Sequence, residues 1–232
     1  MRLAALLVLT AFATATFAAD SRETRPVTGF SGIDLAVPAK LEIIQGDTEA
    51  LALQGPADAL ADIETVVRAD GVLVIRKRTR TSWPFHPEIR IVANMKRVES
   101  IAVTGSGDVF ARTLSSPKLT LAIAGSGDIH VPALETESAL VTISGSGDVR
   151  VAGRAASVVS KIAGSGDLKA EKLETRKATV SIAGGGDVAI WVRDSLAVKI
   201  AGSGDVRYYG DPSIEKKIVG SGWVRRRGPA PS

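Results

Sequence analysis

The stretch "VTGSGDVFA" at residues 103–111 recurs along the chain and determines the expected fold. Close copies read "IAGSGDIHV" from 123, "ISGSGDVRV" from 143, "IAGSGDLKA" from 162, "IAGGGDVAI" from 182 and "IAGSGDVRY" from 200, and a degenerate copy, "IVGSGWVRR", starts at 218. The first glycines fall at positions 105, 125, 145, 164, 184, 202 and 220, so the steps are 20, 20, 19, 20, 18 and 18 residues. A period near twenty is typical of a solenoid in which each repeat forms one coil.

Apolar residues alternate with polar ones inside each copy. Leu119, Leu121 and Ile123 precede one tetrapeptide, and Ile129 and Val131 follow it. This spacing of two is the periodicity of a β-strand with one buried face. The sequence therefore predicts an all-β fold, a single-stranded right-handed parallel β-helix with about 18–20 residues per coil.

The alternation continues through the tetrapeptide and gives the glycines a structural explanation. Gly125 and Gly127 share the inward parity of Ile123, whereas Ser126 and Asp128 share the outward parity. Glycine is expected where the coil interior leaves no room for a side chain or where the backbone needs a positive φ. We expect turn and ladder roles, and no catalytic role, for Gly105, Gly107, Asp108, Gly125, Gly127, Asp128, Gly145, Gly147, Asp148, Gly164, Gly166, Asp167, Gly184, Gly186, Asp187, Gly202, Gly204 and Asp205.

Stacked coils would place these aspartates in one column about 4.8 Å apart. Neighbouring carboxylates would then repel by roughly 0.9 kcal/mol in water and by about 3.5 kcal/mol at an effective dielectric constant of 20. Backbone amides and serine hydroxyls can offset this repulsion without a metal. A second column, two residues further on, is mostly basic and adds to that compensation: it contains Phe110, His130, Arg150, Lys169, Ala189, Arg207 and Arg225.

A calcium-stabilised β-roll is one alternative for the repeated aspartates. Such rolls use the nonapeptide pattern G-G-x-G-x-D-x-U-x, and Ca²⁺ takes six to eight oxygen ligands. Here the period is about twice as long and each copy supplies one acidic residue. We therefore expect no cofactor and no metal site, with a calcium ladder as the alternative.

A polysaccharide lyase or hydrolase is the enzymatic alternative. Asp128 and His130 share a face, as do Asp148 with Arg150, and a pair of carboxylates in a groove would serve a glycosidase. The same pairing recurs coil after coil, whereas a catalytic site is a single place that breaks the pattern. A phosphate-binding loop is excluded, because no strand–helix context and no Walker lysine accompany the glycines.

The first eighteen residues have the pattern of a secretory signal peptide. Arg2 precedes the apolar run "LAALLVLTAFATA", and the small residues Thr16 and Ala18 predict cleavage after Ala18. No other stretch is apolar enough to predict a transmembrane span in the mature chain. The chain has no cysteine, and its formal charge of +4, with 29 basic and 25 acidic residues, does not indicate a nucleic-acid partner.

The domain boundaries follow from where the period holds. Residues 19–100 lack it but keep strand patterns, so we expect an irregular β region that covers one end of a solenoid formed by residues 101–227. Residues 228–232 are expected to form a disordered tail. The loop "TSWPFHPE" carries Trp83 and Phe85, which would form either a ligand-binding lip or a cover over the core edge, and Trp223 ends the aspartate column.

The order "FSGIDLAVPAKLEIIQGDTEALALQG", "DGVLVIRK" and then serial "GSGDV" units resembles the bacterial GIN-domain family of auto-transporter adhesin heads over roughly residues 28–224. The copies "GGGD" at Gly184 and "GSGW" at Gly220 depart from its repeat. The resemblance implies an exported β-solenoid. With it, the sequence predicts a non-enzymatic, adhesin-like scaffold or binding module of the cell envelope, in the periplasm, at the outer surface or secreted. The partner is left open, and a cell-envelope protein or glycan is the expected class.

Overall fold

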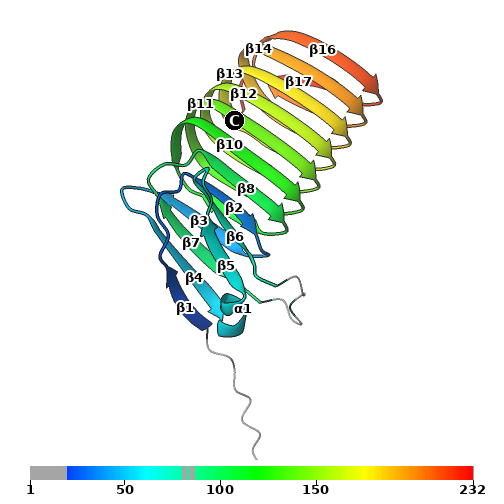
Figure 1. Ribbon diagram of the computed structural model, residues 1–232. Coiled ribbons are helices and arrows are strands. Elements are labelled where there is room, and N and C mark those ends of the chain that lie inside the picture. The colour runs from blue at the N-terminus through cyan, green and yellow to red at the C-terminus, as the bar shows by residue number, and fades with distance from the viewer. Residues whose placement is uncertain (1–19, 80–82, 84–86, 232) are drawn as a thin grey trace, which may run out of the picture.

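The computed structural model describes residues 20–79, 83 and 87–231, and the predicted signal peptide lies outside these residues. One sheet of 17 strands and one short helix make up the described elements (Figure 1). The prediction of an all-β solenoid is confirmed. The elements are β1 Asp20–Arg25, β2 Gly32–Ala36, β3 Lys40–Gln45, β4 Ala50–Pro56, α1 Ala57–Ala61, β5 Ile63–Val67, β6 Val72–Lys77, β7 Arg90–Met95, β8 Ser100–Gly105, β9 Asp108–Ala111, β10 Leu114–Gly125, β11 Ile129–Gly145, β12 Val149–Gly164, β13 Leu168–Gly184, β14 Val188–Gly202, β15 Val206–Tyr209, β16 Ser213–Gly220 and β17 Val224–Gly228.

Strands β10 to β14 follow one another as stacked parallel coils. Gly125 pairs with Gly145, Gly145 with Gly164, and Gly164 with Gly184, so equivalent positions of the repeat lie above one another. Steps of 18 to 20 residues in the sequence are therefore single steps of about 4.8 Å along the stack.

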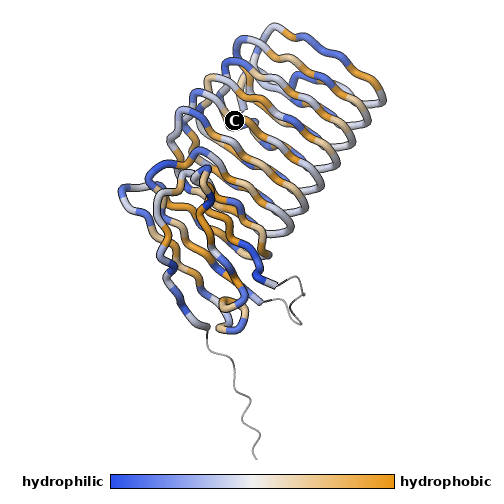
Figure 2. Tube along the Cα trace, viewed as in Figure 1, coloured by the Kyte–Doolittle hydropathy of each residue, from blue (hydrophilic) through white to orange (hydrophobic). Residues whose placement is uncertain are grey.

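The core consists of columns of aliphatic side chains inside the coils. Ile143 lies in register between Ile123 and Ile162, and all three side chains are buried. Figure 2 shows hydrophobic residues at matching places in successive coils. Burying one such side chain contributes about 1.5–3 kcal/mol, so the repeated apolar positions are the main source of stability.

The first coils are stacked in an order that differs from the chain order. Strand β2 lies between β6 and β8, and β3 lies between β7 and β9, all in parallel register. The coil made by β2 and β3 is thus inserted between one made by β6 and β7 and one made by β8 and β9. This arrangement accounts for the loss of the period before residue 100.

Antiparallel strands extend the sheet beyond the first of these coils. Strand β4 pairs with β7 and β1, and β5 pairs with β6. Helix α1 follows β4, buries Leu60, and receives a hydrogen bond from the Arg25 guanidinium to the Leu60 carbonyl (2.9 Å). Among the described residues, no helix combines the length and apolarity needed to cross a bilayer. The antiparallel strands and helix α1 cover the N-terminal end of the core.

The opposite end of the stack carries charged residues at inward positions. Lys216 pairs with the buried Val198, and Arg226 pairs with Tyr208 on the facing side of the coil. Trp223 lies 4.6 Å from the Arg225 guanidinium, measured to the ring centroid. Charges pointing inward on a last coil oppose pairing with another sheet edge.

Candidate functional site

The glycine of each turn directs its carbonyl to the next coil. Gly125 has φ +139°, and its carbonyl accepts hydrogen bonds from the amides of Ser146 (2.9 Å) and Gly147 (3.3 Å). Gly127 and Gly147 are buried, and a Cβ on Gly147 would overlap the carbonyl oxygen of Gly127. The turn therefore requires glycine for its backbone direction and for close stacking.

The aspartates of the turns form a ladder of hydrogen bonds to the backbone. The amide of Asp148 donates to Oδ1 of Asp128 (2.9 Å), and the amide of Asp167 donates to Oδ1 of Asp148 (3.2 Å). The same bond links Asp108 to Asp128, Asp167 to Asp187, Asp187 to Asp205, and Asp205 to Trp223. One oxygen of each carboxylate is thus used to join two coils.

Basic side chains of the column two residues beyond the aspartates bind the second carboxylate oxygen, Oδ2, on several coils. Arg150 contacts Oδ2 of Asp128 (3.1 Å) and of Asp148 (2.9 Å), and Lys169 Nζ lies 2.6 Å from Asp148 Oδ2. Burial by itself raises the pKa of Asp148, but the hydrogen bonds from Lys169 and the Asp167 amide and the charges of Lys169 and Arg150 outweigh it and lower the pKa. Asp187 is paired with Arg207 in the same way (2.9 Å).

The geometry leaves the aspartate column poorly suited to calcium. Among the described residues there is no group of three or more His, Cys, Asp or Glu side chains that could hold a metal. Asp128 and Asp148 each direct one oxygen to an amide and the other to a cation. Calcium needs six to eight oxygens, which this arrangement does not gather.

Asp128 and His130, the suspected acid–base pair, line one groove but are not joined by a hydrogen bond among the residues that the structure describes. In the described part of the chain, Asp128 bonds to the Asp148 amide and to Arg150, and no bond joins it to His130. The exposed imidazole of His130 instead packs edge-on against the ring of Phe110, with centroids 5.4 Å apart. This pair borders an open groove of about 590 Å³ that Asp128 and Lys40 also line.

Trp83 is partly buried against the core. Lys77 Nζ lies over its ring, 4.4 Å from the centroid, and also 3.5 Å from Asp62. Phe85, the other residue considered for a ligand lip, lies outside the described residues.

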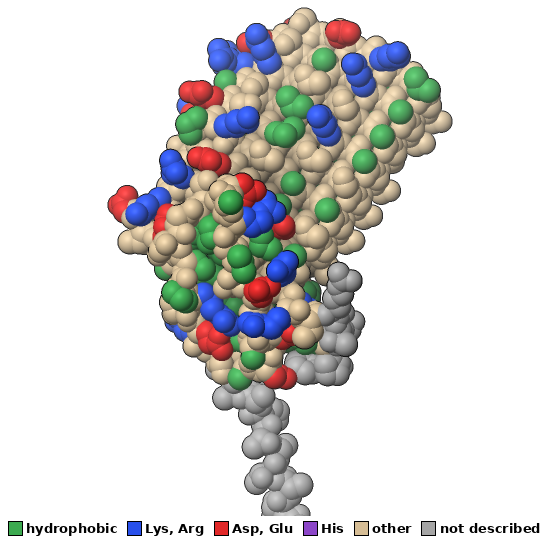
Figure 3. All heavy atoms as spheres, in the orientation of Figure 1, with side chains coloured by type: hydrophobic (Ala, Val, Ile, Leu, Met, Phe, Trp, Pro, Cys, Tyr) green, Lys and Arg blue, Asp and Glu red, His purple; other side chains and the backbone are tan. Residues whose placement is uncertain are grey.

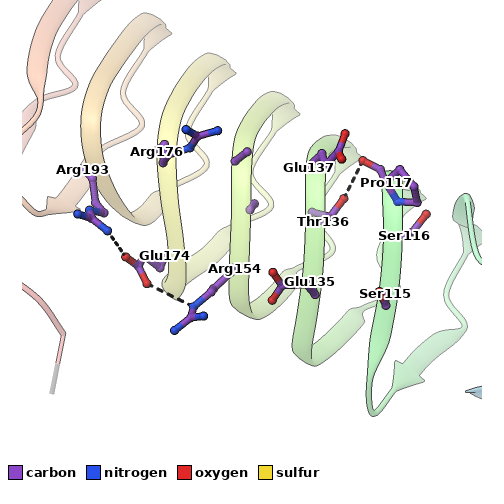
Figure 4. A pocket seen from close by; sticks show the side chains of 12 residues that line it. Ser115, Ser116, Pro117, Glu135, Thr136, Glu137, Arg154, Glu174, Arg176 and Arg193 are labelled. Carbon is purple, nitrogen blue, oxygen red and sulfur yellow. Dashed lines mark hydrogen bonds and ion pairs between the residues drawn. The ribbon is translucent and has the colours of Figure 1, made fainter.

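An open trough of about 750 Å³ crosses the coils from β10 to β14 (Figure 4). Two outward columns border it, and sequence reasoning did not single out either one. The first column contains Glu135, Arg154 and Glu174 in register. The side chain of Glu174 lies 3.6 Å from Arg154 and 2.8 Å from Arg193.

The second border of the trough runs two residues further along each strand. Glu137, Ala156 and Arg176 hold equivalent positions here, because their neighbours pair in register. The sequence trace of these two columns lies in the segments "LETE" at 134–137, "GRAA" at 153–156 and "LETR" at 173–176. This trace is weak, because the same position is acidic, basic or small in successive coils, whereas the turns repeat one motif.

The chain matches the family described as "Putative auto-transporter adhesin, head GIN domain" over residues 29–212. A putative adhesin from Bacteroides fragilis has the same fold, with a TM-score of 0.86, 22% identity, and coverage of 90% of this chain and 97% of the other. A putative lipid binding protein from Parabacteroides distasonis aligns with a TM-score of 0.75 and 23% identity over 90% of this chain and 96% of the other. A putative adhesin from Parabacteroides merdae gives 0.71 and 20%, over 90% and 96%. No curated protein matches this sequence. The chain therefore belongs to the GIN-domain family of auto-transporter adhesin heads.

Proposed function

We propose that this protein is an exported, non-enzymatic binding module of the cell envelope that holds an elongated glycan in the trough of Figure 4. The supporting observation is the extent of the trough, whose lining comes from five consecutive strands, β10 to β14. Four coil steps correspond to about 19 Å. An extended polymer can use contacts on every coil, which suits a repetitive scaffold better than a compact substrate does.

The absence of catalysis is part of this proposal. The turn aspartates are the carboxylates that a glycosidase would use. Asp128 and Asp148 instead bond to amides of the next coil and to basic side chains. A general acid needs a raised pKa, whereas the pKa of Asp148 is lowered. The family description and the relatives named as adhesins agree with a binding role.

Export is proposed from the apolar N-terminal run and its small-residue cleavage pattern. The measurement is cell fractionation followed by N-terminal sequencing of the mature protein. A new N-terminus at Ala19 in an envelope or secreted fraction agrees with the proposal. Intact protein in the cytosol contradicts it.

The binding role is tested with a glycan array and with a pull-down from envelope extract, using the mature chain. Retention of envelope glycans without any change in their size is the expected result. Release of shortened products, lost in Asp128→Asn or His130→Ala, would show an enzyme instead. Failure to retain any glycan in both assays would contradict the proposed function.

Calcium dependence is tested by thermal melting in EDTA and in millimolar Ca²⁺. We expect the same melting temperature in both solutions, because amides and basic side chains already occupy the aspartate oxygens. A rise of several degrees with Ca²⁺ would favour the metal ladder and would give the column a second role.

A further inference from the structure

We propose that the trough bordered by Glu135, Glu137, Arg154, Glu174, Arg176 and Arg193 binds an acidic polysaccharide, one whose sugars carry both carboxylates and free hydroxyls. This inference rests on the proposed function and names the ligand class of the same site. Carboxylates of the polysaccharide bind the arginines, and its hydroxyl groups donate to the glutamates.

The arginines exceed their acidic partner at one end of the trough. Arg154 and Arg193 both contact Glu174, so two positive charges face one negative charge. Arg176 is exposed on the opposite border, and within the described residues no hydrogen bond or ion pair involves its side chain. A guanidinium group binds a carboxylate through two parallel hydrogen bonds, so Arg176 is the strongest candidate for a ligand carboxylate.

Ala156 leaves room for the ligand beside this arginine. Its position is equivalent to that of Glu137 on one neighbouring coil and Arg176 on the other. The methyl group of Ala156 leaves the trough open between the long side chains of Glu137 and Arg176, which Figure 4 labels. Beneath it, Thr136 and Ala155 are buried and form a closed floor.

The other end of the trough selects against densely charged ligands. Glu135 and Glu137 are exposed there; Glu135 lies one coil from Arg154, and Glu137 lies two coils from Arg176. Carboxylates accept hydrogen bonds from hydroxyls but repel anionic groups of any kind. The glutamate end therefore favours sugar hydroxyls and the arginine end favours carboxylates, a combination that an acidic polysaccharide offers and that an anionic lipid surface, with charged groups throughout, does not.

The spacing along the coils also suits a polysaccharide. Arg154 lies on β12 and Arg193 on β14, with Glu174 on β13 between them. Two coil steps amount to about 9.6 Å, close to the length of two linked sugar rings in an extended 1,4-linked chain. A chain parallel to the stack would therefore meet Arg154 and Arg193 about one disaccharide apart, with Arg176 on the opposite border between them.

The test is titration calorimetry with oligogalacturonate, its carboxyl-reduced neutral counterpart of equal length, and phosphatidylglycerol vesicles. Oligogalacturonate is expected to bind, more weakly as salt rises, and the neutral counterpart at least tenfold more weakly. Arg176→Gln is expected to reduce affinity about tenfold, the loss of one charged hydrogen bond. Ala156→Trp is expected to reduce affinity by a similar factor, about tenfold, because the indole ring fills the space of the ligand. Lys161→Gln and Ala163→Trp, on an exposed outward face outside the trough, are the matched controls and are expected to bind like the wild type.

Three results would overturn the inference. Equal binding of the neutral oligosaccharide would remove the role of the arginines, and unchanged affinity of both trough variants would move the site elsewhere. Binding of vesicles alone would identify a lipid surface. In the first case glycan binding in the trough remains, so the proposed function stands. In the second case the glycan-binding role remains, but its placement in the trough fails. If the wild type retains no glycan on the array or from envelope extract, both the inference and the proposed function fail.

Discussion

Asp148 and Asp167 are joined by a hydrogen bond from the amide of Asp167 to Oδ1 of Asp148 (3.2 Å). The bond recurs between successive turns, so each aspartate stabilises the following coil. In a stack of parallel coils, this bond gives the amide N–H of the turn an acceptor. Without the carboxylate, a carbonyl oxygen would have to accept that hydrogen bond. A column of like charges is thereby tolerated, because every member has backbone or basic partners.

Replacing Asp148 with alanine is expected to lower the free energy of unfolding by about 1–3 kcal/mol, because the Asp167 amide loses its acceptor. Asp148→Asn keeps an acceptor oxygen and should cost less. Chemical denaturation measures both changes. Asp47→Ala, in an exposed turn outside the repeats, is the control and is expected to stay within about 0.5 kcal/mol. Equal stability of the wild type and Asp148→Ala would show that the ladder bond is dispensable.

The solenoid is expected to lose stability in acid. The pKa of Asp148 is lowered in the folded state, so its stabilising effect is complete above the unfolded value of about 3.9 and disappears as the pH falls through the lower folded value. Thermal melts followed by circular dichroism between about pH 5 and pH 2 measure this loss. The Asp148→Asn variant should show a shallower dependence on pH, and an identical slope would contradict the assignment.

Two glycines of the repeats are expected to differ sharply in tolerance. Gly147→Ala places a methyl group against the Gly127 carbonyl and should destabilise the protein by about 3 kcal/mol or more. Gly185 has open space around it and is exposed, so Gly185→Ser should change stability by less than about 0.5 kcal/mol. Both substitutions are compared by denaturation. A tolerated alanine at 147 would mean that the coils can separate without cost.

The last coil is expected to associate with other copies when its inward charges are removed. Lys216→Ile combined with Arg226→Leu continues the apolar columns of Val198 and Tyr208 to an open edge. Light scattering coupled to size-exclusion chromatography should then detect concentration-dependent oligomers. Lys217→Ile changes an outward position on the same strand and serves as the control. If the double variant elutes as the wild type does, the charges have no role in keeping this end free.

The predictability of the fold followed from the repeat. Two glycines and one aspartate, repeated every 18 to 20 residues, specify a turn, and the alternation around Ile123 specifies which side chains are buried. The region before residue 100 was less predictable, because pairing of β2 with both β6 and β8 is a long-range choice. The local alternation of a strand does not predict which distant strand will pair with it.

The candidate site shows the same division. The position of Asp128 in a column could be inferred, but the direction of its two oxygens, one to an amide and one to Arg150, required coordinates. The trough residues Ala156 and Arg176 carry no motif, and their importance comes from a juxtaposition across coils.

The amino-acid sequence by itself determined the coil length, the turn and the inward columns, because those properties depend on spacing within about twenty residues. Only the tertiary structure decided the order of the first coils and the meeting of Glu137, Ala156 and Arg176 along one trough. The physical reason is that burial and backbone geometry are encoded locally and repeatedly, whereas contacts between outward side chains depend on which strands stack and in which register.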